Sequence, residues 1–141
     1  MHINMVSAIN NTGKVYFKIY KEAMNTDILK DFTKRLIKEQ KGQKILLICD
    51  NLKVHHAYIF RDWLEERKDK IEVFYLPSYS PEYNPDEYLN NDLKQNIALK
   101  PQAKDTNDIQ KHTNDFMKNL TNNPEHVKAY FNHPKLKSYK N

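Results

Sequence analysis

A chain of 141 residues suits one domain and is long enough to bury roughly two-thirds of the surface that its unfolded form exposes. A formal net charge of +5, with 29% charged residues, makes the protein basic, which permits binding to DNA but does not by itself indicate it. The only cysteine excludes an internal disulfide, no apolar run reaches the roughly 18 residues of a membrane span, and no secretory leader opens the chain. We therefore expect a soluble, intracellular protein.

The chain should open with a β-hairpin. Residues 6–10 and 15–20 are two short candidate strands, and the Asn-Asn-Thr-Gly segment at 10–13 is typical of a hairpin turn. In the second strand the apolar residues alternate with polar or aromatic ones, as Val15, Phe17 and Ile19 against Tyr16, Lys18 and Tyr20. This alternation predicts one buried face and one face in contact with water.

An amphipathic helix is expected next. Asn25 or Thr26 suits its N-cap, and the helix should end near Gly42. Its apolar stripe consists of Ile28, Leu29, Phe32, Leu36 and Ile37.

A short apolar strand at residues 44–49 then ends in an acid, Asp50. The run is consistent with a strand buried on both faces, and the carboxyl ends of such strands are where open α/β sheets bind ligands. A helix is expected within residues 52–70, followed by a strand at 71–76. The residues of this helix that should face inward are Ile59, Phe60, Trp63 and Leu64.

A stiff loop containing Pro77 and Pro81 precedes the next helix. Asn84 suits the N-cap of that helix, Pro85 its first position and Glu87 its third, where an acid completes a capping box. On a helical wheel the buried stripe is Leu89, Leu93 and Ile97, whereas Glu87, Asn91 and Lys94 share another face.

Two further helices are expected near the C-terminus. The first begins at Asp105 or Thr106 and runs through Leu120; the second begins at Asn123-Pro124. Their apolar residues, which should pack on the flank of the sheet, are Ile109, Phe116, Met117 and Leu120 in the first, and Val127, Tyr130 and Phe131 in the second. The element order predicts a mixed α/β domain at residues 1–100 and a helical extension at 101–141.

Two segments carry a resemblance to a known family. ICDNLKVHHA at residues 48–57 and YLPSYSPEYNPDEYLNNDLK at residues 75–94 resemble the second and third acidic blocks of DDE-superfamily transposases. The match is specific to the bacterial insertion-sequence branch related to mariner, the insertion-sequence six-thirty family, and weaker similarity extends over nearly the whole chain. It implies a ribonuclease-H-like fold in which three acids hold two Mg²⁺ or Mn²⁺ ions that cut and rejoin DNA. Asp50 matches the second acid and Glu87 the third.

The resemblance also implies a first acid on a strand that precedes the block beginning here at Val6, with a helix-turn-helix region before that strand. Because the sequence starts at Met1, we expect the C-terminal part of a catalytic domain, ribonuclease-H-like but lacking its first strand. We expect this part to be inactive by itself, and to act as a homodimer or with an upstream fragment.

Each candidate site residue also has an ordinary structural interpretation. Asp50 suits a metal ligand because carboxylates are hard oxygen donors, but an Asx-turn or helix cap explains it too. Glu87 is equally well explained by the capping box.

The resemblance places His55 beside the site, where it contacts DNA phosphate or orients Asp50, unless it is a plain helix-entry residue. Asn51, Tyr79, Asn91 and Lys94 are candidates for the same surroundings, although a solvated lysine is the commoner outcome on a helix.

The sequence thus predicts a metal-dependent transposase fragment that acts on DNA in the bacterial cytoplasm, at the nucleoid. A non-catalytic DNA- or protein-binding relic is the first alternative. Another ribonuclease-H-like nuclease, such as a resolvase, is the second, and the SYSPEYNP loop at residues 78–85 argues against it.

Overall fold

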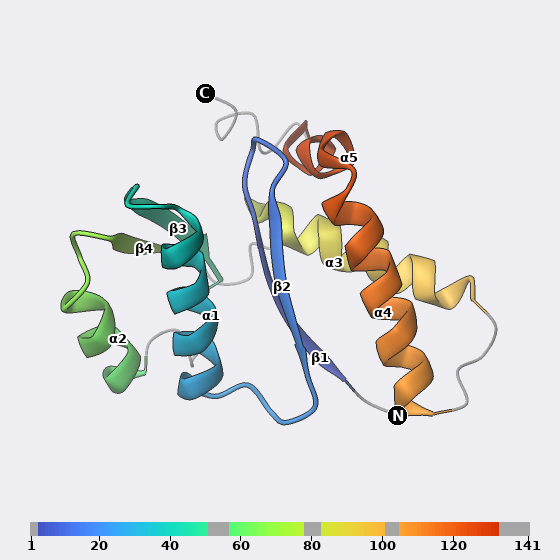
Figure 1. Cartoon of the computed structure of the whole chain (residues 1–141), viewed down its shortest axis with the longest axis horizontal. Helices are drawn as coiled ribbons and strands as arrows, with labels where there is room; N and C mark the ends of the chain where they lie inside the picture. Colours follow the sequence, from blue (N-terminus) through green and yellow to red (C-terminus); the bar gives the residue numbers. More distant parts are fainter. Residues whose placement is uncertain (1–2, 51–56, 78–82, 101–104, 133–141) are drawn as a thin grey trace. The chain divides into compact units, whose positions relative to one another are not determined.

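The computed structural model describes residues 3–50, 57–77, 83–100 and 105–132, whose helices and strands are labelled in Figure 1. The described residues form two compact units. One combines the residues up to Glu22 with those from Pro85 onwards, and the other runs from Ala23 to Asn84. The helices of the predicted C-terminal extension belong to the same unit as the hairpin; the predicted boundary at residue 100 stays a prediction.

The first unit begins with the predicted hairpin. Strands β1 (Asn4–Ile9) and β2 (Val15–Tyr20) pair antiparallel, from Asn4 opposite Tyr20 to Ile9 opposite Val15. In the turn, the side-chain oxygen of Asn10 accepts hydrogen bonds from the backbone N–H groups of Thr12 and Lys14, and Gly13 has φ of +97°. These features confirm the hairpin predicted from the sequence.

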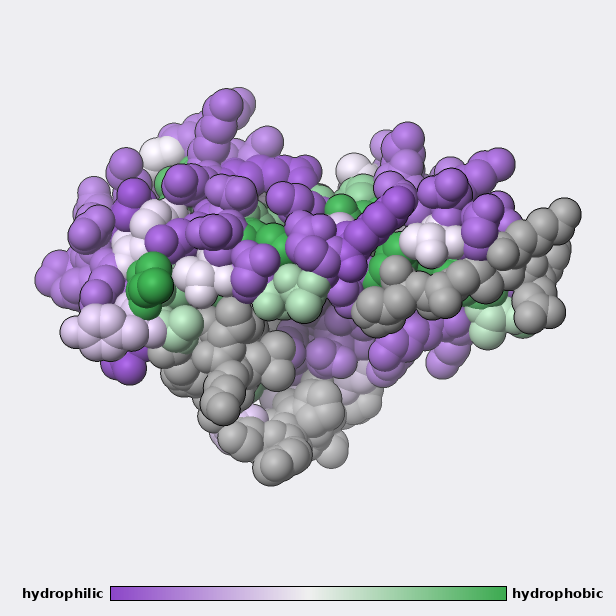
Figure 2. All heavy atoms as spheres, turned by 90° about the horizontal axis from the view of Figure 1, so that it is seen from below, coloured by the Kyte–Doolittle hydropathy of each residue, from purple (hydrophilic) through white to green (hydrophobic). Residues whose placement is uncertain are grey.

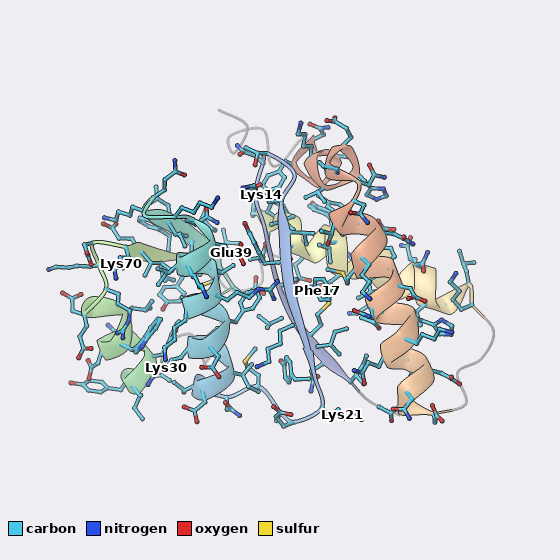
Figure 3. All side chains as sticks on the ribbon, viewed as in Figure 1. Lys14, Phe17, Lys21, Lys30, Glu39 and Lys70 are labelled. Atoms are coloured by element: carbon cyan, nitrogen blue, oxygen red, sulfur yellow. The ribbon has the colours of Figure 1, made fainter. Side chains whose placement is uncertain are left out.

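Three helices complete this unit: α3 (Pro85–Ala98), α4 (Thr106–Thr121) and α5 (Pro124–Ala129), the last continued by the 3-10 turn Tyr130–Asn132. Helix α3 contacts β1 and α4, and α4 contacts β2. Their shared core consists of Val15, Leu89, Met117, Leu120, Val127 and Tyr130. Phe17, labelled in Figure 3, packs against this core. Helix α4 thus contacts β2, and Val127 of α5 shares the core with Val15 of β2, while the packing of the C-terminal extension as a whole stays a prediction.

One prediction for β2 is wrong. Tyr20 was expected on the face in contact with water, yet it is only 8% exposed. Burial is the larger cause, and the charge of Glu22 the smaller, of a raised pKa at this phenol. A tyrosine ring is largely apolar, so that it can be buried at a position where strict alternation predicts exposure.

The second unit contains α1 (Thr26–Glu39), β3 (Ile45–Cys49), α2 (Tyr58–Glu65) and β4 (Ile71–Tyr75). Asn25 is the N-cap of α1, since its side-chain oxygen accepts a hydrogen bond from the N–H of Ile28 at 2.9 Å. Lys30 and Glu39 of this helix are labelled in Figure 3. The predicted stripe is confirmed, because its residues are buried or packed against the core. Ile28, Leu29, Phe32 and Leu36 are buried, and the partly buried Ile37 packs against the cluster that contains Leu29.

Strands β3 and β4 pair in parallel, from Ile45 opposite Ile71 to Cys49 opposite Tyr75. At their start the N–H of Ile45 donates to the carbonyl oxygen of Lys70 at 2.9 Å. The expectation that β3 is buried on both faces is wrong, because Leu46 and Ile48 are 66% and 41% exposed. An apolar run cannot itself distinguish burial on one face from burial on two, since this depends on which elements pack against the sheet.

Helix α2 buries Phe60 and Trp63, whose rings stack with centroids 6.0 Å apart, and Leu64 packs beside them. Ile59 was predicted to face inward but is 64% exposed. At 100° per residue it lies at the edge of the stripe centred on Phe60, Trp63 and Leu64 rather than within it.

Hydrophilic side chains dominate the face of the described residues seen in Figure 2, with small hydrophobic areas between them. Among the helices that the structure describes, none combines the length and the apolar character that crossing a membrane requires.

Candidate functional site

Asp50 directly follows β3, at the carboxyl end of the parallel pair. The ladder continues to this point, because the N–H of Leu76 donates to the carbonyl oxygen of Cys49 at 2.9 Å. This hydrogen bond anchors the carbonyl group directly before Asp50 to the neighbouring chain segment. The predicted position of this acid at a strand end is confirmed.

The carboxylate of Asp50 has a partner that sequence reasoning missed. The side-chain Nδ2 of Asn84 donates to Asp50 Oδ1 at 2.8 Å, and Asn84 is only 8% exposed. The sequence indicated Asn84 only as a helix cap. No local signal connects two residues 34 positions apart, so this contact depends on tertiary folding.

Cys49, the residue before Asp50, is half-buried. Burial chiefly, and the charge of Asp50 secondarily, raise its pKa to about 12. In the metal-free protein the side chain therefore remains a neutral thiol at physiological pH, and not the nucleophilic thiolate.

Glu87 lies in the first turn of α3, which begins at Pro85 as predicted. Leu89 and Leu93 are buried, whereas Glu87 is half-buried and Asn91 and Lys94 are exposed. The predicted buried stripe is confirmed at Leu89 and Leu93, whereas its third residue, Ile97, is half-buried, as Glu87 is. The capping box itself stays a prediction.

Asp86, next to Glu87, forms a hydrogen bond with the hairpin. Its Oδ1 accepts a hydrogen bond of 2.7 Å from the hydroxyl of Ser7 in β1. This bond ties the first turn of α3 to the adjacent strand. Asp86 therefore has a structural partner in β1.

A second polar cluster lies on α3 and α5. Asp92 Oδ2 accepts a hydrogen bond from the hydroxyl of Tyr130 at 2.6 Å and lies 2.8 Å from Nε2 of His126. Burial is the main cause of a raised pKa at Tyr130, followed by its hydrogen bond to Asp92 and the charges of Asp92 and Asp86. The cluster joins the C-terminal segment to α3, and nothing local in the sequence predicted it.

The two candidate acids belong to different units, Asp50 to the second and Glu87 to the first. Their assignment as a pair of ligands stays a prediction. Within the described residues, no three His, Cys, Asp or Glu side chains form a group that would hold a metal ion. Asn51, His55 and Tyr79 lie outside the described residues.

Asp27 and Asp31 are exposed on α1, as expected for acids of a helix. They therefore do not resemble the first acid that the family carries on a strand.

Comparison with known proteins identifies both family and fold. Residues 1–110 match the family model described as DDE superfamily endonuclease. A comparison with curated proteins found no match.

Among solved structures, the chain resembles the catalytic domain of Mos1 mariner transposase with a TM-score of 0.69 and 18% identity, over 96% of this chain and 73% of that one. Two structures of the Mos1 transposase catalytic domain with raltegravir, one with Mg and one with Mn, give TM-scores of 0.68 at 17% identity, over 97% of this chain and 75% of theirs. The predicted ribonuclease-H-like α/β fold class is thereby confirmed.

Proposed function

The chain belongs to the DDE superfamily endonucleases, and from this we propose that it forms part of a transposase catalytic domain that cleaves DNA and transfers its strands. The match over residues 1–110 is the observation that carries the proposal. The position of Asp50 at the carboxyl end of a parallel strand pair supports it, because that edge is where α/β sheets bind ligands.

We propose that Asp50 and Glu87 hold divalent metal ions, Mg²⁺ or Mn²⁺. Their carboxylates are the hard oxygen donors that these ions prefer. Mg and Mn both accompany the similar Mos1 catalytic domain. When bound, such ions activate an attacking oxygen and stabilise a leaving oxygen in phosphodiester cleavage.

The surrounding polar residues are proposed to contact DNA. Asn91 and Lys94 are exposed on α3, one and two turns beyond Glu87. A lysine at this position suits a phosphate contact, which fixes the position of the duplex without reading its sequence. By the family resemblance, Asn51, His55 and Tyr79 are proposed to line the same surface.

For the polypeptide of residues 1–141 used by itself, we propose metal binding without strand cleavage. The family pattern requires a third acid on a strand, and Asp50 and Glu87 account for two. An upstream segment that carries this acid is proposed to complete the site, and a homodimer is the other proposed assembly. This proposal concerns the isolated polypeptide, whatever chain it forms part of in the cell.

The first experiment is calorimetry with Mn²⁺ on the wild-type chain, Asp50→Ala and Glu87→Ala. We expect the wild type to bind and both substitutions to abolish binding, since each removes a charged ligand. Asp31→Ala on α1 and Asp115→Ala on α4 are matched controls, because both remove an exposed acid from the same unit as one of the candidates.

A wild-type chain that binds no Mn²⁺ would contradict the metal site. If that chain still binds double-stranded DNA, the non-catalytic binding relic becomes the better interpretation.

A further inference from the structure

The buried amide of Asn84 faces one of the two candidate ligands. Its Nδ2 lies 2.8 Å from Asp50 Oδ1, and both residues belong to the unit from Ala23 to Asn84. Only 8% of Asn84 is exposed. The contact therefore lies within one compact unit and is largely shielded from water on the side of the amide.

The chemistry of this contact fixes its direction. A side-chain amide buried without a partner costs free energy, and among the described residues no buried side-chain nitrogen or oxygen lacks one. Asn84 offers N–H donors, and the ionised carboxylate of Asp50 offers only acceptors. The result is a charge-assisted hydrogen bond, which is stronger than one between neutral groups.

Such a bond restricts how the Asp50 carboxylate turns about its side-chain torsions. The hydrogen bond uses only Oδ1. Because a carboxylate has two oxygens with about four lone-pair sites, Asp50 can still bind a cation. Carboxylates that bind metals are themselves held by hydrogen bonds from outer residues, which orient them for the ion. Asn84 has the geometry of such an outer residue.

We propose that Asn84 is a positioning residue: its amide holds the carboxylate of Asp50 in the orientation that binds the metal ion. This inference rests on the proposed function, since it assumes that Asp50 is a ligand. The role is compatible with the predicted N-cap of α3, because a cap uses the side-chain oxygen of Asn84 and the contact with Asp50 uses its nitrogen. Sequence places Glu87, the other candidate ligand, three residues after Asn84.

The test uses Asn84→Ser in the full 141-residue chain. Serine is as good an N-cap as asparagine, so the start of α3 is retained while the amide donor is removed. Asn25→Ser is the matched control: it changes a capping asparagine of the same unit whose side chain bonds to Ile28 and Ala23. Calorimetry with Mn²⁺ measures the affinity of both variants, of the wild type and of Asp50→Ala.

We expect Asn84→Ser to weaken Mn²⁺ binding by about 10- to 100-fold, the usual effect of losing an outer-shell partner, and Asn25→Ser to bind as the wild type does. Equal affinity of Asn84→Ser and the wild type would overturn the inference but leave the proposed function intact. If the wild type binds no Mn²⁺, or Asp50→Ala binds as the wild type does, the proposed function fails and the inference fails with it.

A second readout needs no metal. The side-chain amide signal of Asn84 in a ¹⁵N-edited NMR spectrum should shift on Asp50→Ala and stay in place on Asp31→Ala. If Asn84 only stabilises the loop or caps the helix, its signal would keep the same position in both variants. That result would overturn the inference independently of any binding measurement.

Discussion

The two units differ in how far the residues of their sheets are buried. In the hairpin of β1 and β2 every residue is buried or half-buried, although the strands contain Ser7, Lys18 and two tyrosines. In the parallel pair of β3 and β4 alternate residues are exposed, among them Leu46, Ile48 and Phe74, although β3 is entirely apolar apart from its cysteine.

The cause lies in the neighbouring elements. The hairpin contacts α3 and α4 within its own unit, whereas the described part of the second unit leaves one face of its sheet in contact with solvent. Apolar composition therefore indicates a strand but not its burial. The same substitution should therefore have different effects on stability in the two units. Three pairs of variants, each with one residue from either unit, measure this difference.

The largest expected effect comes from a pair of leucines. Leu89 in α3 is fully buried in the core of the first unit, and Leu46 in β3 is 66% exposed. Leu89→Ala should lower the free energy of unfolding by about 2–5 kcal/mol through lost contacts and a cavity, and Leu46→Ala by about 0.5 kcal/mol or less. Urea unfolding followed by circular dichroism measures both. Equal losses would mean that the exposed face of the second sheet is covered in solution.

A pair of glycines should give a smaller difference. Gly13 and Gly42 both have positive φ, +97° and +90°, but a Cβ atom at Gly13 would lie 2.7 Å from Pro124 Cβ, while one at Gly42 would meet nothing within 4 Å. Gly13→Ala should cost about 2–4 kcal/mol, from backbone strain plus steric overlap with α5, and Gly42→Ala about 1–2 kcal/mol from strain alone. Thermal unfolding distinguishes them. A Gly13→Ala variant no less stable than Gly42→Ala would exclude the close approach of the hairpin turn to Pro124.

The smallest effect is expected at a pair of tyrosines. Tyr130→Phe removes the hydrogen bond to the partly exposed Asp92 and should cost about 1.5 kcal/mol at pH 7, whereas Tyr58→Phe, at a residue 77% exposed, should cost almost nothing.

The cost at Tyr130 should also depend on pH. The pKa of Tyr130 is raised in the folded chain above its usual value of 10.0, so its contribution is fully present below pH 10 and is lost as the pH rises above it. The difference in stability between wild type and Tyr130→Phe should therefore shrink above pH 10. A difference that is constant from pH 7 to 11 would contradict the buried, neutral state of this phenol.

Local signals predicted most of the secondary structure. Asn25 and Asp105 are the N-caps of α1 and α4, and α3 begins at Pro85 directly after Asn84. The hairpin follows from Gly13 and the alternating residues of β2. Capping, turn formation and periodicity act between residues a few positions apart, so the sequence displays them directly.

The sequence by itself therefore determined the order of the elements, the family of the chain and the two acids that carry the proposed chemistry. Only the tertiary structure decided which side chains hold those segments in place. Asn84 reaches Asp50 across 34 positions, Ser7 reaches Asp86 across 79, and Tyr130 reaches Asp92 across 38. The exposure of Leu46 and Ile48 was decided in the same way. The physical reason is that these contacts join residues far apart in the sequence. Their proximity depends on the path of the folded chain, which no local sequence pattern contains.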